Sequence, residues 1–204
     1  EGQALMHPDP TFRADDEALL SWLFDEVGFG TVFAQTADGP RVAHTPVAMG
    51  PDGGIRFHLA KRNLLTPQLD GAQALIVIDG PQGYISPRWY AKRDTVPTWN
   101  YVSIELEGRV SVLDEAGLEE MLHELIVRHE GKLSGERWSA AETSERVWAA
   151  QLEGIVGYEL TVTASRSTVK LSQKSSAEER ERIAAGLVSA SNPALAEWKR
   201  EAAA

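Results

Sequence analysis

The alternation of hydrophobic and polar residues changes period near the start of the chain. Over residues 15–27 the apolar positions recur every three or four residues, which predicts an amphipathic helix that Asp15 can cap. After Gly28 the period falls to two, which is typical of half-buried strands. We expect four strands, over residues 31–36, 41–49, 55–60 and 72–79. They are separated by turns at Asp38–Gly39 and at 50–54 and by a short helical segment at 61–69.

The second half of the chain mixes strands with capped helices. A long strand is expected over 98–113, with a bulge or bend at Gly108. Helices are expected over 114–129 and 144–152, a strand over 155–164 and a further extended piece over 167–171. Ser176 with Glu179 has the capping-box spacing, and Pro193 suits the first position of a last helix. The strands cluster as hairpins without βαβ alternation, which favours an antiparallel barrel or sandwich with peripheral helices over a Rossmann fold.

The segment over residues 80–101 stands out from this pattern. It combines Pro and Gly breakers with Trp89, Trp99, three tyrosines and several basic side chains, so no regular helix can form there. Loops of this composition often hold a flat ligand or a partner. The alternative is a loop that folds over the core, with its tryptophans as plugs.

Composition removes several classes of site. The 204 residues suit one domain, with 1–7 flexible and 172–204 as a helical extension. Without cysteine the chain has no disulfide, thiolate nucleophile or Fe–S cluster, and a cytoplasmic location is expected. No apolar run is long enough for a membrane span, and the five histidines lack metal-ligand spacing. A net charge of −10 disfavours contact with nucleic-acid phosphates.

One strand leads directly into basic and polar residues, in the sequence FHLAKRN over residues 57–63. Lys61, Arg62 and Asn63 stand where backbone N–H groups and a point charge together can hold an anion. A basic surface turn is the other interpretation.

Three separated motifs, GPQGYISPRWY (80–90), VPTWNY (96–101) and KLSQ (170–173), make the chain resemble the PaiB-like family of FMN-binding split-barrel proteins. RVAHTP (41–46) and the FHLAKRN segment also fit, and the agreement spans residues 8–187. The chain has Lys61-Arg62-Asn63-Leu64 where the family often has Arg-Ala-Asn-Pro, so the charge moves and an extra one appears. It also has Lys174 where an asparagine is usual. Both departures bear on the contacts with the phosphate.

The resemblance implies a mainly β protein with peripheral helices (α+β), built on a six-stranded antiparallel split β-barrel that forms a homodimer with FMN in a groove between the subunits. The strands and the turn that would hold the phosphate and part of the ring provide Ala43, His44, Thr45, His58, Leu59, Ala60, Lys61, Arg62 and Asn63. The partner subunit would cover the ring with Ser86, Trp89, Trp99, Asn100 and Tyr101, and the KLSQ motif adds Lys170, Ser172 and Gln173. Lys170 is a candidate for a positive group near the flavin ring.

The resemblance also implies a regulatory, transcription-related flavoprotein. The residues themselves show no helix-turn-helix, and the net charge makes direct DNA binding doubtful. A flavin-dependent oxidoreductase acting on a small molecule is the alternative function, and a dimeric scaffold without FMN is a third. No catalytic residue and no metal ligand is assigned.

Overall fold

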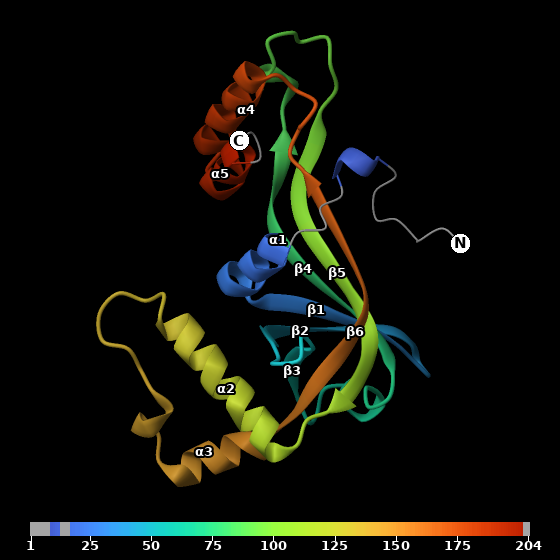
Figure 1. The fold of residues 1–204 in the computed structure, drawn as a ribbon, viewed down its shortest axis with the longest axis vertical. Helices are drawn as coiled ribbons and strands as arrows, with labels where there is room; N and C mark the ends of the chain where they lie inside the picture. Colours follow the sequence, from blue (N-terminus) through green and yellow to red (C-terminus); the bar gives the residue numbers. More distant parts are fainter. Residues whose placement is uncertain (1–8, 13–16, 202–204) are drawn as a thin grey trace. The chain divides into compact units, whose positions relative to one another are not determined.

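The computed structural model describes residues 9–12 and 17–201. Six strands form a closed ring in the order β1-β2-β3-β6-β5-β4 (Figure 1). Their bounds are β1 Phe29–Thr36, β2 Gly39–Met49, β3 Ile55–Ala60, β4 Gln73–Ile85, β5 Thr98–Val112 and β6 Ile155–Lys170. The helices are α1 Glu17–Trp22, α2 Glu115–Glu130, α3 Glu145–Leu152, α4 Ala177–Ser189 and α5 Pro193–Glu201.

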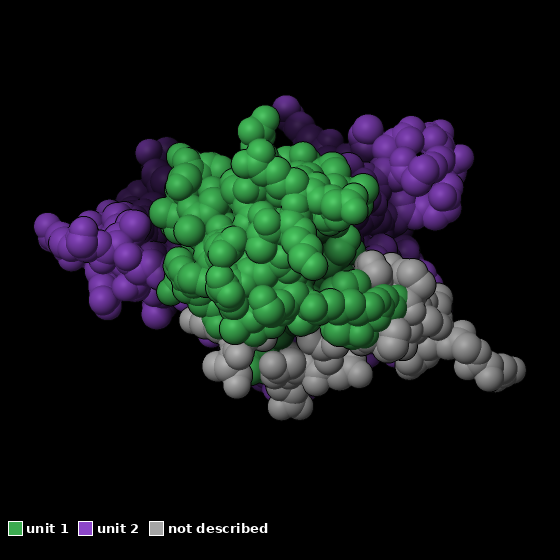
Figure 2. Space-filling model, turned by 90° about the horizontal axis from the view of Figure 1, so that it is seen from above, with its two compact units in different colours: residues 1–19, 79–104, 166–204 green, residues 20–78, 105–165 purple. Residues whose placement is uncertain are grey.

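The chain divides into two compact units, coloured separately in Figure 2. Unit 2 comprises residues 20–78 and 105–165, and therefore holds β1 to β3, α2 and α3. Unit 1 comprises residues 1–19, 79–104 and 166–204, with α4 and α5. The strands β4, β5 and β6 each begin in one unit and end in the other.

In unit 2 successive residues of a strand alternate between a buried and an outer face, as a closed barrel requires. In β3 the buried positions are Ile55, Phe57 and Leu59, and the rings of Phe57 and Tyr158 stack 5.4 Å apart. The Tyr158 hydroxyl donates to the Thr66 carbonyl oxygen at 2.8 Å, so the polar tip of this buried ring is satisfied.

Helix α2 packs on the outside of the strands of unit 2. Asp114 accepts a hydrogen bond from Gly117 N at 2.8 Å and caps the helix. Its apolar face buries Leu118, Met121 and Leu125 against Ala48. Arg56 on β3 donates to Glu120 of α2 at 2.8 Å and to Glu159 of β6 at 2.7 Å, so one guanidinium joins three elements.

Four sequence expectations differ from the structure. The helix expected over 15–27 continues from α1 into a π-helix, Leu23–Val27, and ends at Gly28 in the left-handed conformation. Its expected cap Asp15 and the expected flexible residues 1–7 lie outside the described residues. The expected breakers at 80–83 do not end β4, which reaches Ile85 and shortens the loop to residues 86–97. The two extended pieces over 155–171 form the single strand β6. The bend expected at Gly108 is a close approach of strands instead, because a Cβ there would lie 2.0 Å from the Thr161 carbonyl oxygen.

In unit 1, α4 and α5 pack on each other (Figure 1), and Ile183, Leu187 and Leu195 of these helices are buried. Lys199 of α5 is fully buried, and its ammonium donates to the Leu171 carbonyl oxygen at 2.7 Å. Burial, reinforced by the nearby Arg180, lowers the pKa of Lys199 to about 8. The buried ammonium of Lys199 thus contacts Leu171, which belongs to the KLSQ motif.

The stability of unit 1 should therefore rise with pH. Below about pH 8, Lys199 is charged in both the folded and the unfolded chain, and the folded state bears the whole cost of burying the charge. Between the folded pKa of about 8 and the usual value of 10.5, the unfolded chain binds more protons, so the free energy of unfolding increases with pH. From about pH 8 to about pH 9.5 we expect a rise of about 1.5 kcal/mol relative to Lys199→Met. Urea unfolding curves of both proteins at the two pH values measure it; equal slopes against pH would contradict it.

Candidate functional site

The turn after β3 presents the cationic part of the candidate site. Lys61 and Arg62 are exposed, and neither makes an ion pair within the part of the chain that the structure describes. Asn63 is held inside the turn, where its Oδ1 accepts from Leu65 N at 2.9 Å. The Thr66 hydroxyl donates to the Ala60 carbonyl oxygen at 2.8 Å, which fixes the start of the turn. Two free cations on a braced turn suit a phosphate.

The residues predicted on β2 and β3 divide between the two faces of the barrel. Ala43, Thr45 and Leu59 are on the buried face, so they can reach a ligand on the outer face only through their backbone. The Thr45 hydroxyl is already used, because it donates to the His58 carbonyl oxygen at 2.7 Å. His44 is exposed on the outer face, with its Nδ1 3.0 Å from the Thr31 hydroxyl.

His58 lies in different surroundings from His44. It lines a cavity whose walls include Leu122 and Ile126 of α2 and Trp148 of α3. Burial lowers the pKa of His58, so the ring is neutral near pH 7. Its Nδ1 is buried without a hydrogen-bond partner among the described residues. The two histidines thus face different spaces, and a flavin contact by His58 stays a prediction.

The residues predicted in unit 1 include one buried polar pair. Asn100 is fully buried and its Nδ2 donates to the Ser172 hydroxyl at 3.0 Å. Ser172 has a φ of 60°, a left-handed conformation that is costly for a residue with a Cβ. Strain of this kind gathers at functional sites, where the surrounding contacts hold it in place. The Gln173 Oε1 accepts a hydrogen bond from Leu171 N at 2.9 Å, which supports the turn.

Aromatic side chains flank this pair in unit 1. Trp99 is 49% exposed, its Nε1 donates to the Gln82 Oε1 at 3.2 Å, and its ring meets that of Tyr84 edge-on at 6.5 Å. Trp89 instead packs on α4, since a Cβ on Gly186 would come within 2.4 Å of its ring. Trp99 therefore offers a ligand an open ring face, while Trp89 acts as the plug that the composition also allowed.

The remaining predicted residues of unit 1 lie near these two. Ser86 caps the 3-10 turn Pro87–Trp89 by accepting from Arg88 N. Lys170 donates to the Thr98 hydroxyl at 3.0 Å, and Tyr101 is half-buried on β5. The structure thus brings Asn100 and Ser172 into contact, while the residues of the β3 turn belong to the other unit.

Sequence reasoning missed Tyr84, Tyr90 and Thr31. Tyr84 is 49% exposed beside Trp99, and it was assigned to a loop because Gly80 and Pro81 were expected to end the strand. Burial raises the pKa of Tyr90, which also hydrogen-bonds Ser172. Thr31 is recognisable only from the strand register that sets it opposite His44.

Comparisons with known proteins show the family of the chain. The model of a family described as a putative FMN-binding domain matches residues 6–164. The chain is 30% identical over 158 residues to protease synthase and sporulation protein PAI 2 of Bacillus subtilis, covering 74% of this chain and 75% of that protein. The chain belongs to the PaiB-like FMN-binding family. FMN is the cofactor of this PaiB-like chain.

Solved structures confirm the fold class. The flavocytochrome Anf3 of Azotobacter vinelandii superimposes with a TM-score of 0.59 at 16% identity, over 80% of this chain and 72% of that one. The FAD and heme binding protein of Mycobacterium smegmatis gives 0.58 at 16% identity, over 85% and 80%. At this identity the likeness concerns the fold alone, which is the six-stranded antiparallel split barrel with peripheral helices.

The donor set of the PaiB-like chain fits FMN. The phosphate needs cations that are not already paired, and Lys61 and Arg62 meet that need. The ring needs an accessible flat surface, and Trp99 has one. Bound FMN would supply redox chemistry through its isoalloxazine ring.

None of the helices in the described part of the chain has the length and hydropathy of a membrane-spanning helix.

Proposed function

We propose that the PaiB-like chain is a cytoplasmic regulatory flavoprotein that binds FMN in a groove between two copies of itself. The observation that carries the proposal is an apolar row on the outer face of β1 and β2. Phe29, Phe33 and Val42 are 49%, 40% and 49% exposed, and in the strand register Phe33 is opposite Val42 and Phe29 is opposite Pro46. Single exposed apolar residues are ordinary, but two apolar cross-strand pairs that flank Thr31 and His44 on one face are typical of an interface.

The apolar row continues onto β4 and includes a predicted flavin contact. Leu75 is opposite Phe33, and Val77 is opposite Thr31. His44 is also opposite Thr31, on the β2 side. A second copy that covers this face would therefore also cover His44 and exclude water from a ligand bound beside it.

In this arrangement each copy contributes a different part of the site. One copy provides His44 with Lys61 and Arg62 for the phosphate. The partner provides Trp99 as a stacking surface, and Ser172, which the buried Asn100 holds in place, as a polar contact to the ring. Lys170 is the candidate for the positive group near the ring.

The regulatory part of the proposal rests on the relative and on charge. The Bacillus subtilis relative carries a name that refers to protease synthesis and sporulation. A chain with a net charge of −10, doubled in a dimer, is repelled by DNA phosphates. We therefore propose that regulation acts through FMN or a protein partner and not through direct contact with DNA.

Three measurements on one purified sample test the function. We expect flavin absorbance bands after FMN is added, no retardation of promoter DNA even at low salt, and no oxidation of NAD(P)H above that of free FMN. Retardation at low salt would overturn the indirect mode of action, since phosphate contacts are strongest there. Steady NAD(P)H turnover with oxygen or a dye would favour an oxidoreductase instead, and absence of flavin uptake would refute both.

A further inference from the structure

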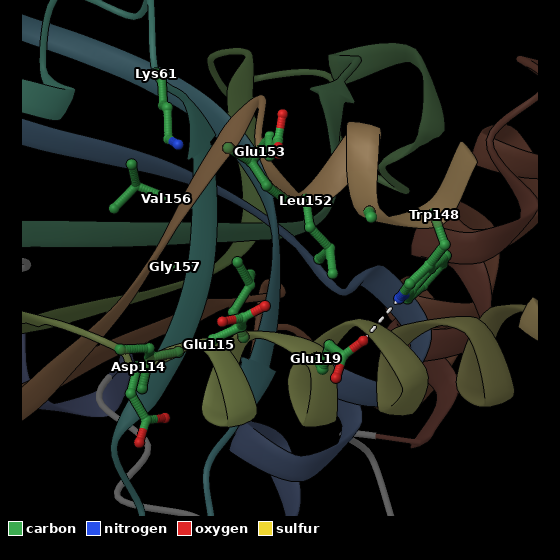
Figure 3. Close-up of a pocket in the computed structure, with 13 residues that line it drawn as sticks. Lys61, Asp114, Glu115, Glu119, Trp148, Leu152, Glu153, Val156 and Gly157 are labelled. Atoms are coloured by element: carbon green, nitrogen blue, oxygen red, sulfur yellow. Dashed lines mark hydrogen bonds between the residues drawn. The ribbon is translucent and has the colours of Figure 1, made fainter. Parts of the chain in front are cut away.

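A cavity of about 590 Å³ lies in unit 2, where α2 and α3 meet the start of β6 (Figure 3). This volume is in the range of sites that hold a small molecule. All of its lining residues belong to unit 2, and of the predicted flavin-site residues it contains Lys61 alone. The cavity is therefore a second candidate site, with its own chemistry.

The walls of the cavity are apolar and include one aromatic face. Leu118, Leu152 and Val156 line it together with the indole of Trp148. The Trp148 Nε1 donates to the Glu119 Oε1 at 2.8 Å, and the ring stacks on His123 at 5.3 Å. Because both contacts fix the indole, the aromatic wall is already oriented before any ligand arrives.

The polar lining is predominantly negative. Asp114, Glu115, Glu119 and Glu153 contribute four carboxylates against the single ammonium of Lys61. Figure 3 shows the Asp114 carboxylate directed away from the other labelled side chains, in keeping with its role as the cap of α2. A concave site with this surplus attracts cations and repels anions.

Two of these carboxylates have no partner among the residues that the structure describes. Glu115 and Glu153 make no hydrogen bond or ion pair through their side chains within residues 9–12 and 17–201. In Figure 3, Glu115 and Glu119 lie on one side of the cavity, and Glu153 lies on the other side with Lys61. Their charges are therefore available to a ligand between them.

A neighbouring cavity of about 250 Å³ borders the first on its apolar side. It shares Trp148, Leu152 and Ile155 with the first cavity and is otherwise lined by Leu122, Ile126, Gln151 and His58. The one histidine in its wall is His58, whose buried Nδ1 has no partner among the described residues. Unsatisfied buried polar atoms are uncommon in folded proteins, and contact with a ligand is one explanation.

We propose that the larger cavity binds an organic cation, a primary amine carried on an apolar and preferably aromatic body. The ammonium group is placed among Glu115, Glu119 and Glu153, and the body packs on Leu152 and Trp148. A cation near the indole face gains a further attraction from the ring. Lys61 is the one lining residue that the proposed flavin site also uses. No other lining residue is proposed to contact FMN, so the inference does not rest on the proposed function.

Calorimetric titration of the full chain with three probes of similar shape tests the ligand class. The probes are 2-phenylethylamine, 2-phenylethanol and 3-phenylpropionate, which are cationic, neutral and anionic at neutral pH. We expect the amine to bind at least about tenfold more tightly than the alcohol, which corresponds to about 1.4 kcal/mol, and the carboxylate not to bind. Equal binding of amine and alcohol, or no binding of the amine at millimolar concentration, would overturn the proposal.

A pair of matched variants locates the binding. Glu115→Gln with Glu153→Gln should weaken amine binding about tenfold and leave FMN binding unchanged. The control, Glu136→Gln with Glu145→Gln, removes the same net charge from exposed positions outside the cavity lining and should leave amine binding unchanged. Equal losses in both variants would show that the amine responds only to the overall charge, which contradicts the site.

Discussion

FMN binding should weaken by at least about 100-fold when Lys61 and Arg62 are both replaced by alanine. Each cation is expected to make a charge-assisted hydrogen bond to the phosphate, worth about 1.5 to 3 kcal/mol, and the two losses together correspond to two or more factors of ten in Kd. Both side chains are exposed and make no ion pair among the described residues, so the substitution should leave the fold intact. Quenching of flavin fluorescence on titration gives the Kd of each protein.

The control for this experiment removes the same charge elsewhere. Lys132→Ala with Arg146→Ala takes two exposed cations from the end of α2 and from α3, away from the β3 turn in sequence. Its affinity for FMN should stay within about threefold of the parent, because screened charges at a distance contribute little. An unchanged Kd in the Lys61 and Arg62 variant would show that the phosphate binds elsewhere. Equal losses of FMN affinity in both variants would show that only the net charge of the chain matters.

Unfolding should become easier by about 3 kcal/mol in Gly108→Ala. The added methyl group would lie 2.0 Å from the Thr161 carbonyl oxygen and 2.8 Å from its carbonyl carbon, so the backbone of β6 would have to move. Overpacking of this kind costs about 1 to 3 kcal/mol, and a clash with backbone belongs at the upper end. The two strands are in direct contact here, since the Thr163 hydroxyl donates to the Glu107 carbonyl oxygen at 3.1 Å.

Urea unfolding followed by circular dichroism measures this cost. The control is Ser111→Ala, which leaves a methyl group at an exposed position of the same strand and should stay within about 0.5 kcal/mol of the parent. A loss below about 1 kcal/mol in Gly108→Ala would mean that β5 and β6 are further apart than the structure places them.

The local pattern predicted most strands and helices because short-range chemistry determines them. The bounds of β3 follow from the alternation of Ile55, Phe57 and Leu59 between a glycine turn and a basic turn. The cap of α4 at Ser176 was likewise readable from side-chain chemistry. These signals depend on residues within a few positions of each other.

Features that depend on distant residues could not be predicted in this way. The strand β4 continues through Gly80 and Pro81, against the local tendency of both residues to break a strand. The close approach at Gly108 depends on Thr161, which is far along the chain.

The candidate site shows the same division. The basic turn at Lys61 and Arg62 was readable from the sequence, and the KLSQ motif was recognised by resemblance. The contact between Asn100 and Ser172 joins residues 72 positions apart, and no local pattern encodes it. The cavity beside Trp148 also escaped prediction, since it exists only where α2, α3 and β6 meet.

Sedimentation velocity of the FMN-loaded chain, recorded at both protein and flavin wavelengths, tests the central claim most directly. The account predicts that flavin sediments with a species of twice the chain mass, at one FMN per chain. Phe33→Asp, which places a charge in the apolar row of β1, should sediment as a monomer that has lost its flavin. Flavin that remains with a monomer of the parent or of the variant would contradict binding between two copies.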